Sequence, residues 1–184
     1  MITQNLLCST QFGISAIQFL RASVEPDSRG ALRLIYILTG HIGQLLIPEP
    51  KPAGQADGLW PHTCFEAFIE VEGQSRYHEY NFSPSGEWSA YAFDAYRQRG
   101  QWTCSRAPDI TVTRSPTELV LEASIAWVDL PDNQTGRAYR LGLTAVIEDR
   151  QGGLSYWALI HPAERPDFHL SSGFICRLVS ERFF

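Results

Sequence analysis

Hydrophobic and polar residues alternate along much of the chain with a period of two, which is typical of strands buried on one face. The clearest example spans 118–128, where the odd positions are apolar and the even positions are mostly polar or small. The segment 137–149 repeats this pattern. We therefore expect the odd faces of both strands to lie in one core. The odd positions are Leu119, Leu121, Ala123, Ile125 and Trp127, followed by Tyr139, Leu141, Leu143, Ala145 and Ile147.

Nine segments rich in β-branched and aromatic residues are bounded by Gly, Pro, Asn, Asp or Ser, and no long helical periodicity interrupts them. Short turn-forming links at 72–75 and 83–86 predict antiparallel neighbours. The proline-rich segment 40–61 is expected to be a surface loop crossing between sheets. The sequence therefore predicts an all-β fold, a two-sheet antiparallel β-sandwich. The expected strands are 14–24, 31–39, 63–72, 76–83, 87–93, 109–115, 118–128, 137–149 and 154–161.

One strand, at 63–72, carries chemistry on the face that alternation turns away from the core. Its odd residues are apolar, whereas the even positions combine aromatic, imidazole and carboxylate groups if the extended conformation begins at Trp60. Sugar recognition needs a flat apolar surface and nearby polar groups that pair hydroxyls. Trp60 and Glu66 fit these two roles, although a solvated Glu66 and a Trp60 that covers a core edge fit the same pattern.

Length and charge narrow the functional classes. The 184 residues are expected to form one domain, 1–184, and the formal charge of −5 argues against a nucleic-acid partner. No apolar run approaches the roughly 18 residues of a membrane span, and the N-terminal residues do not resemble a secretory signal. We therefore expect a cytoplasmic protein without a membrane partner. Four widely spaced cysteines without a C-x-x-C pair are expected to be reduced structural thiols.

Catalytic motifs do not occur. The chain has no G-x-S-x-G elbow, phosphate-binding loop, H-E-x-x-H motif or Rossmann glycine pattern. Glycoside hydrolysis remains an alternative only through a pairing of Glu66 with Asp94, and carboxylate pairs are common. We therefore expect a non-enzymatic protein.

Three sequence blocks carry a family resemblance. Trp60 followed by Glu66 in a Glu-x-Phe-Ile strand, the aromatic-rich stretch 77–88, and 156–162 followed by 166–169 resemble bacterial DOMON-like domains and the related family nine carbohydrate-binding modules. The blocks span roughly 59 to 175. The resemblance implies a jelly-roll β-sandwich that binds sugars or haem. It further implies Trp60 as an aromatic platform, Glu66 as a polar contact and Trp157 as a second aromatic wall.

Further residues are candidates for the same site. His62, His161 and His169 lie in or beside the blocks, where they contact ligand, hold a metal or anchor loops through hydrogen bonds. Asn81 shares parity with Glu79, and Trp88 lies on the next predicted strand, where a core position is the alternative. Haem binding is disfavoured because Met1 is the only methionine, so no cofactor is expected.

The expected function is therefore the non-catalytic binding of a small carbohydrate or polyol at an aromatic-lined site. The alternative is a cytoplasmic protein-interaction or self-association domain, of which a homo-oligomer is one form.

Overall fold

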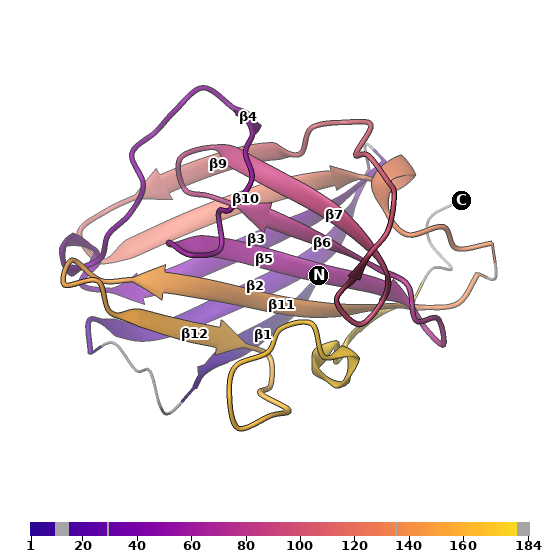
Figure 1. Ribbon diagram of the computed structural model, residues 1–184. Helices are drawn as coiled ribbons and strands as arrows, with labels where there is room; N and C mark the ends of the chain where they lie inside the picture. The colour runs from indigo at the N-terminus through magenta and orange to yellow at the C-terminus, as the bar shows by residue number, and fades with distance from the viewer. Residues whose placement is uncertain (10–14, 29, 135, 180–184) are drawn as a thin grey trace.

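The expected all-β class is confirmed by the computed structural model, which describes residues 1–9, 15–28, 30–134 and 136–179 (Figure 1). Residue 14, the first of the expected strand 14–24, lies outside the described residues. The strands are β1 (Ile2–Cys8), β2 (Ile17–Asp27), β3 (Ala31–Gly40), β4 (Gly54–Gln55), β5 (Cys64–Val71), β6 (Tyr77–Phe82), β7 (Glu87–Ala95), β8 (Gln98–Arg99), β9 (Asp109–Arg114), β10 (Glu118–Ala126), β11 (Tyr139–Glu148), β12 (Leu154–Ala158) and β13 (Cys176–Leu178). Three short 3₁₀ helices, η1 (Ile42–Gln44), η2 (Trp127–Asp129) and η3 (Ser171–Gly173), interrupt them.

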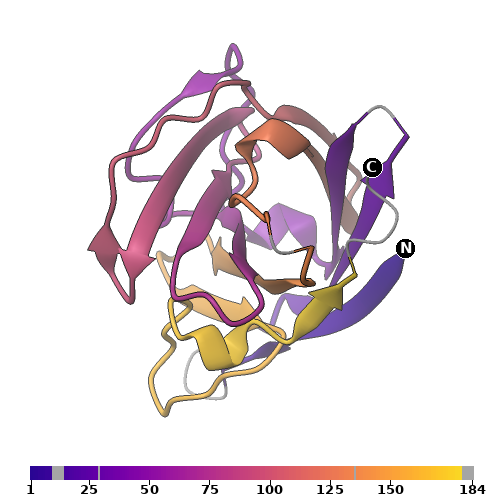
Figure 2. The same cartoon turned by 90° about the vertical axis from the view of Figure 1, so that its right-hand side faces the viewer.

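The strands form two facing halves that are joined along one edge (Figures 1 and 2). Strand β1 makes the join, because residues 2–6 pair with β2 whereas Leu7 and Cys8 pair with β12. The order is β4-β7-β6-β5-β11-β12-β1-β2-β3-β10-β9, with β13 beside β11 and β8 beside β7. Within the described residues the pairing of β4 with β7 is parallel and the other pairings of strands are antiparallel. The sandwich is thus one curled, mixed sheet rather than two separate antiparallel sheets.

The main core lies between the two halves, and it is made by the residues that alternation predicts. On β10 and β11 the odd positions are buried, as are Phe65, Ala67, Ile69 and Val71 on β5. Trp127 is the exception: β10 ends at Ala126, and Trp127 is only partly buried in η2. The chain turns there because the buried Asp129 carboxylate accepts hydrogen bonds from the backbone N–H groups of Ser105 and Arg106.

Strand β5 is buried on its second face as well, so all eight of its residues are buried. A second, smaller cluster of aromatic side chains covers part of this outer face. Phe174, which follows η3, stacks on Phe68 with ring centroids 5.7 Å apart. The cluster consists of Phe68, Tyr77, Tyr91, Phe93 and Phe174, with Phe168 packed against it.

Four strands of the structure, β1, β4, β8 and β13, are not among the nine strands expected from the sequence. β1, β4 and β8 are short or half-exposed, and β13 covers three residues of a segment with irregular patterning. The prediction also extends β12 to residue 161, whereas the strand ends at Ala158. In the described part of the chain, no helix has the length and apolar character needed to cross a membrane.

We predict that Gly142→Ala destabilises the fold by about 1–3 kcal/mol through overpacking. Gly142 lies on β11 opposite Phe68, and a Cβ added there would lie 2.6 Å from Cδ1 of Phe174. The Phe174 ring would have to leave its stacked position. Equilibrium urea denaturation measures the loss. Gly43→Ala is the control, since an added Cβ at that position meets no atom within 4 Å, and equal midpoints for the two variants would contradict the prediction.

Candidate functional site

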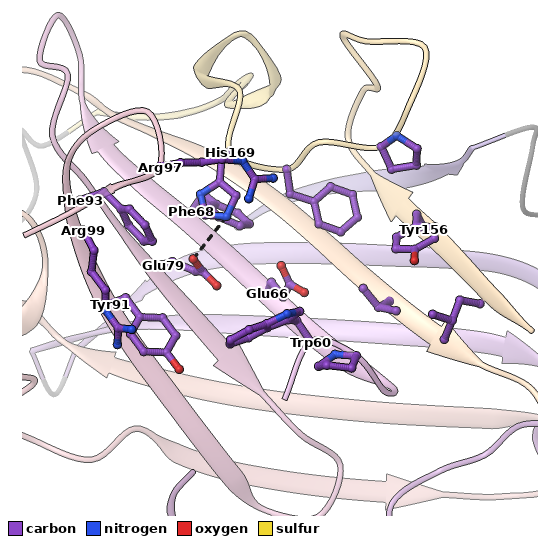
Figure 3. Close-up of a pocket in the computed structure, with 15 residues that line it drawn as sticks. Trp60, Glu66, Phe68, Glu79, Tyr91, Phe93, Arg97, Arg99, Tyr156 and His169 are labelled. Carbon is purple, nitrogen blue, oxygen red and sulfur yellow. Dashed lines mark ion pairs between the residues drawn. The ribbon is translucent and has the colours of Figure 1, made fainter. Parts of the chain in front are cut away.

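A cavity of about 660 Å³ opens on the outer face of β5, β6, β7, β11 and β12 (Figure 3). Its floor is the face of β5 that points away from the main core. The loop before β5 contributes Trp60, and the loop after β12 contributes Phe168 and His169. The cavity therefore brings together segments that are about a hundred residues apart in the sequence.

Strand register determines which polar groups meet on the cavity floor. Glu66 on β5 lies opposite Asn81 on β6 and Thr144 on β11, while Glu79 on β6 lies opposite Tyr91 on β7. Residues directly opposite one another share a face of the sheet, and so do residues two apart on one strand. Glu66 and Glu79 are consequently diagonal neighbours on the same face.

Glu66 is a buried carboxyl group with an unused oxygen. The residue is 3% exposed, and its Oε2 accepts a long hydrogen bond of 3.5 Å from the Thr144 hydroxyl. Its Oε1 has no hydrogen-bond partner in the structure. The pKa of Glu66 is raised well above its ordinary value, first by burial and second by the negative charge of Glu79, and the hydrogen bond from Thr144 opposes the shift. Burial without a partner is costly for a polar atom, which marks Oε1 as a position for a ligand.

Glu79 differs from Glu66 because it has partners. Its Oε1 accepts a 2.7 Å hydrogen bond from Nδ2 of Asn81, and its Oε2 lies 3.7 Å from Nε2 of His169. Burial raises the pKa of Glu79, while the hydrogen bond from Asn81 and the charges of Arg97 and Arg99 lower it. The two carboxyl groups of the floor therefore sit in different electrostatic surroundings.

His169 is held in position at the cavity rim. Its Nδ1 lies 2.8 Å from the Tyr77 hydroxyl, which also accepts a hydrogen bond from the backbone N–H of Arg97 at 3.1 Å. The pKa of His169 is lowered to about 4, chiefly by burial and further by the charge of Arg97. The imidazole is therefore neutral at pH 7, and its contact with Glu79 is not an ion pair at that pH.

Asp167 ties the loop after β12 to the turn between β7 and β8. Its Oδ1 accepts hydrogen bonds from Nη2 of Arg97 at 2.9 Å and from the backbone N–H of His169 at 3.1 Å, and its Oδ2 accepts one from the Tyr96 hydroxyl. Arg97 has a φ of 54°, the left-handed conformation that a tight hairpin requires. This contact fixes the upper boundary of the cavity.

Aromatic side chains form the walls. Trp60 is 47% exposed and lies edge-on to Tyr91, with ring centroids 6.3 Å apart. The Tyr91 hydroxyl donates a 2.7 Å hydrogen bond to Asp57, which anchors the loop that carries Trp60. The guanidinium of Arg99 lies 4.0 Å from the centre of the Tyr91 ring. Trp60 thus has a free face at a position where a ligand can stack.

Tyr156, rather than Trp157, contributes the wall on β12. Trp157 is 7% exposed, belongs to the main core, and donates a hydrogen bond from Nε1 to Ser155. Tyr156 has the opposite parity, lies opposite Val146 of β11 and lines the cavity with Phe168, whose ring centroid is 6.2 Å away. The expectation that Trp157 faces the cavity is therefore corrected by one position. Alternation alone allowed either parity.

Some of the other residues predicted for the site line or adjoin the cavity, and others pack elsewhere in the fold. Trp60, Glu66 and His169 line the cavity, and Asn81 lies directly beneath it, where it orients Glu79. Trp88 is packed in the main core, away from the cavity. Its parity follows from its pairing with Phe82, another residue of that core.

His62 and His161 lie outside the cavity. The Nδ1 of His62 lies 2.8 Å from Oε2 of Glu148, in a separate surface depression. The Nε2 of His161 donates to the backbone carbonyl of Leu7 at 2.8 Å. The three histidines of the sequence analysis are therefore not gathered into one site, and among the described residues no group of three or more His, Cys, Asp or Glu side chains could hold a metal ion.

Asp94, considered with Glu66 as a hydrolytic pair, does not line the cavity. Its carboxylate pairs with Nε of Arg76 at 3.2 Å and is largely exposed. Sequence reasoning missed several cavity residues, although the parity of Glu79 with Asn81 and the aromatic content of 88–93 were signals for some of them. Phe68 was expected on the same face as Glu66, and Tyr91 and Tyr156 were left open by parity. The missed residues are Glu79, Phe93, Arg97, Arg99 and Phe168.

Two solved structures are similar to this chain at low sequence identity. A candidate carbohydrate-binding protein from Bacteroides uniformis ATCC 8492 is similar with a TM-score of 0.70 and 14% identity, over 95% of this chain and 84% of that chain. A family 9 carbohydrate-binding module from Caldicellulosiruptor kristjanssonii, in complex with cellotriose, has a TM-score of 0.47 and 13% identity, over 84% of this chain and 71% of that chain. No protein-family model and no curated protein matches the sequence significantly. The first similarity shows the β-sandwich fold.

We predict that Glu66→Gln stabilises the protein at high pH. Folding raises the pKa of Glu66, so the folded protein is more stable with this carboxyl group protonated. That stability is fully present below about pH 4.5 and is lost as the pH rises through the raised pKa. The amide of the variant cannot ionise, so the melting temperature of Glu66→Gln should exceed that of the wild type by roughly 2–4 °C or more at about pH 8 and match it at about pH 4. A melting-temperature difference that stays constant between these pH values would contradict the prediction. Glu70 and His169 titrate in both proteins and largely cancel, whereas Glu79 interacts with Glu66 and loses a neighbouring negative charge in the variant.

Proposed function

We propose that the cavity binds a small carbohydrate or polyol without transforming it. The observation that carries the proposal is the buried, unpartnered Oε1 of Glu66 beside an aromatic side chain with a free face, Trp60. A pyranose presents C–H groups on its faces and hydroxyl groups around its edge. An aromatic wall with buried hydrogen-bonding groups at its base is suited to both features.

The remaining cavity residues support the same ligand class. Tyr156 and Phe168 provide further apolar surface in the cavity, and Arg99 and Glu79 add polar character to its lining. The volume of about 660 Å³ is within the range of small-molecule sites. The fold neighbour with the TM-score of 0.70 is itself a candidate carbohydrate-binding protein, which supports this class by analogy.

Non-catalytic binding is favoured by the way the polar groups are engaged. His169 is hydrogen-bonded to Tyr77, and Asp94 is paired with Arg76 outside the cavity. Neither is positioned as an acid or base beside Glu66. The arrangement is therefore that of a binding site whose polar groups recognise hydroxyls.

We predict that Trp60→Ala weakens sugar binding by about tenfold or more, equivalent to about 1.4 kcal/mol, because the stacking surface is lost. Isothermal titration calorimetry against a panel of neutral mono- and oligosaccharides measures the change. An affinity unchanged in Trp60→Ala would refute the aromatic platform.

A matched pair on β12 tests which aromatic residue forms the second wall. Tyr156→Ala should reduce affinity for the same sugar while leaving most of the fold stability, because Tyr156 lines the cavity. Trp157→Phe should lower the melting temperature with little effect on affinity, because Trp157 packs in the main core. Calorimetric titration and thermal unfolding of both variants separate the two roles, and the reverse assignment of effects would contradict the placement of these residues.

A further inference from the structure

The two carboxyl groups of the cavity floor are not equivalent in charge. Arg97 and Arg99 act on Glu79 and lower its pKa, but neither contributes to the electrostatics of Glu66. Among the described residues, no Lys, Arg or His forms an ion pair with Glu66. Glu66 therefore has an available oxygen and no positive charge of the protein to balance it when ionised.

The two arginines of the cavity are engaged elsewhere. Arg97 donates from Nη2 to Asp167, and the guanidinium of Arg99 lies over the Tyr91 ring. Figure 3 shows Arg97 beside His169 and Arg99 beside Tyr91, whereas the buried Glu66 carboxyl group lies apart from both on the cavity floor. A positive charge that reaches Glu66 would have to come from the ligand.

The surroundings of Glu66 suit such a charge. Aromatic rings attract cations through their electron-rich faces, and the attraction grows where water is excluded. Trp60, Tyr156 and Phe168 line the cavity around the 3%-exposed Glu66. A carboxylate surrounded by aromatic rings is the combination that recognises an ammonium group.

We infer that the cavity prefers a sugar that carries a free, protonated amino group, whose ammonium nitrogen donates to the carboxyl group of Glu66. This inference rests on the proposed carbohydrate-binding function and specifies its ligand class. Amino sugars keep the C–H faces that stack on Trp60 and add the charge that Glu66 lacks. Neutral and N-acetylated sugars lack that charge and should bind more weakly.

Proton exchange distinguishes the two kinds of ligand. In the empty site burial raises the pKa of Glu66 and favours its protonated form, whereas an ammonium ligand favours its ionised form. Binding of an amino sugar should therefore release a proton from Glu66, and binding of a neutral sugar should not. The other titratable or charged groups that surround Glu66 are Tyr36, Cys64, Glu79, Tyr91, Arg97, Arg99, Tyr156 and His169.

The test uses three β-1,4-linked trisaccharides that differ only in the C2 substituent of each ring: cellotriose, the glucosamine trimer and its fully N-acetylated form. Calorimetric titrations at about pH 6, in buffers of different ionisation enthalpy, give affinity and proton release together. We expect the glucosamine trimer to bind about tenfold more tightly than the other two, with net proton release.

Variants of Glu66 identify the group responsible. Gln is close in shape to a protonated Glu, so Glu66→Gln should weaken the glucosamine trimer by about tenfold, abolish proton release and leave cellotriose within about twofold. Glu66→Asp retains the charge and should retain the preference. Glu148→Gln removes a carboxylate outside the cavity, where Glu148 contacts His62, and serves as the matched control.

The outcomes separate the inference from the proposed function. Equal affinities for cellotriose and the glucosamine trimer in the wild type, or equal losses for both in Glu66→Gln, would overturn the preference for an amino sugar while carbohydrate binding stands. Failure of all three trisaccharides to bind the wild type would overturn both. The selectivity of the wild type decides the question even if Glu66→Gln does not fold.

Discussion

Burial of β5 on both faces is the constraint on which the site depends. Its odd residues fill the core between the two halves of the sheet, and its even residues would face water if the sheet were an ordinary sandwich wall. The loops that carry Trp60 and His169 cover that second face instead. Because these loops cover only part of the outer face of β5, a cavity remains above Glu66. The Glu66 carboxyl group is buried because both faces of β5 are covered, and its raised pKa follows from that burial.

The loops that carry Trp60 and His169 are held in place by a small number of polar contacts between segments distant in the sequence. Asp167 bonds to Arg97 and to the backbone of His169, and Tyr77 bonds to His169 and to the backbone of Arg97. These four residues close a ring between the β7–β8 hairpin and the loop after β12. On the other side, Tyr91 holds the Trp60 loop through Asp57. All of these contacts except the exposed one between Arg97 and Asp167 are partly buried, which favours a preformed site over one that assembles around a ligand.

Alternation along the chain was sufficient to predict the core of β5, β10 and β11, because the period of two is a local property. It did not place Trp60, because β5 begins at Cys64 and Trp60 reaches the cavity from the preceding loop, whereas His62, which has the same parity, lies outside the cavity. It was insufficient for β12, where Tyr156 and Trp157 are both large and aromatic, and only pairing with β11 decides which one points outward. Arg97 and Arg99 could not be found from the sequence either, because a hairpin turn brings them to the cavity and register across β6 and β7 aligns them with Glu79.

The unpartnered oxygen of Glu66 lowers the stability of the folded protein. A buried polar atom without a hydrogen bond lowers stability by about 1–3 kcal/mol, and a glutamine or an apolar residue would fill the same space on β5 without an ionisable group. Glu79, on the neighbouring strand, shows that this sheet can satisfy a buried carboxyl group, since Asn81 and two arginines compensate it. The absence of such compensation at Glu66 is therefore a local property of one position rather than of the fold. A ligand group that donates to Oε1 recovers the lost interaction, so the same feature that weakens the empty protein strengthens the bound one.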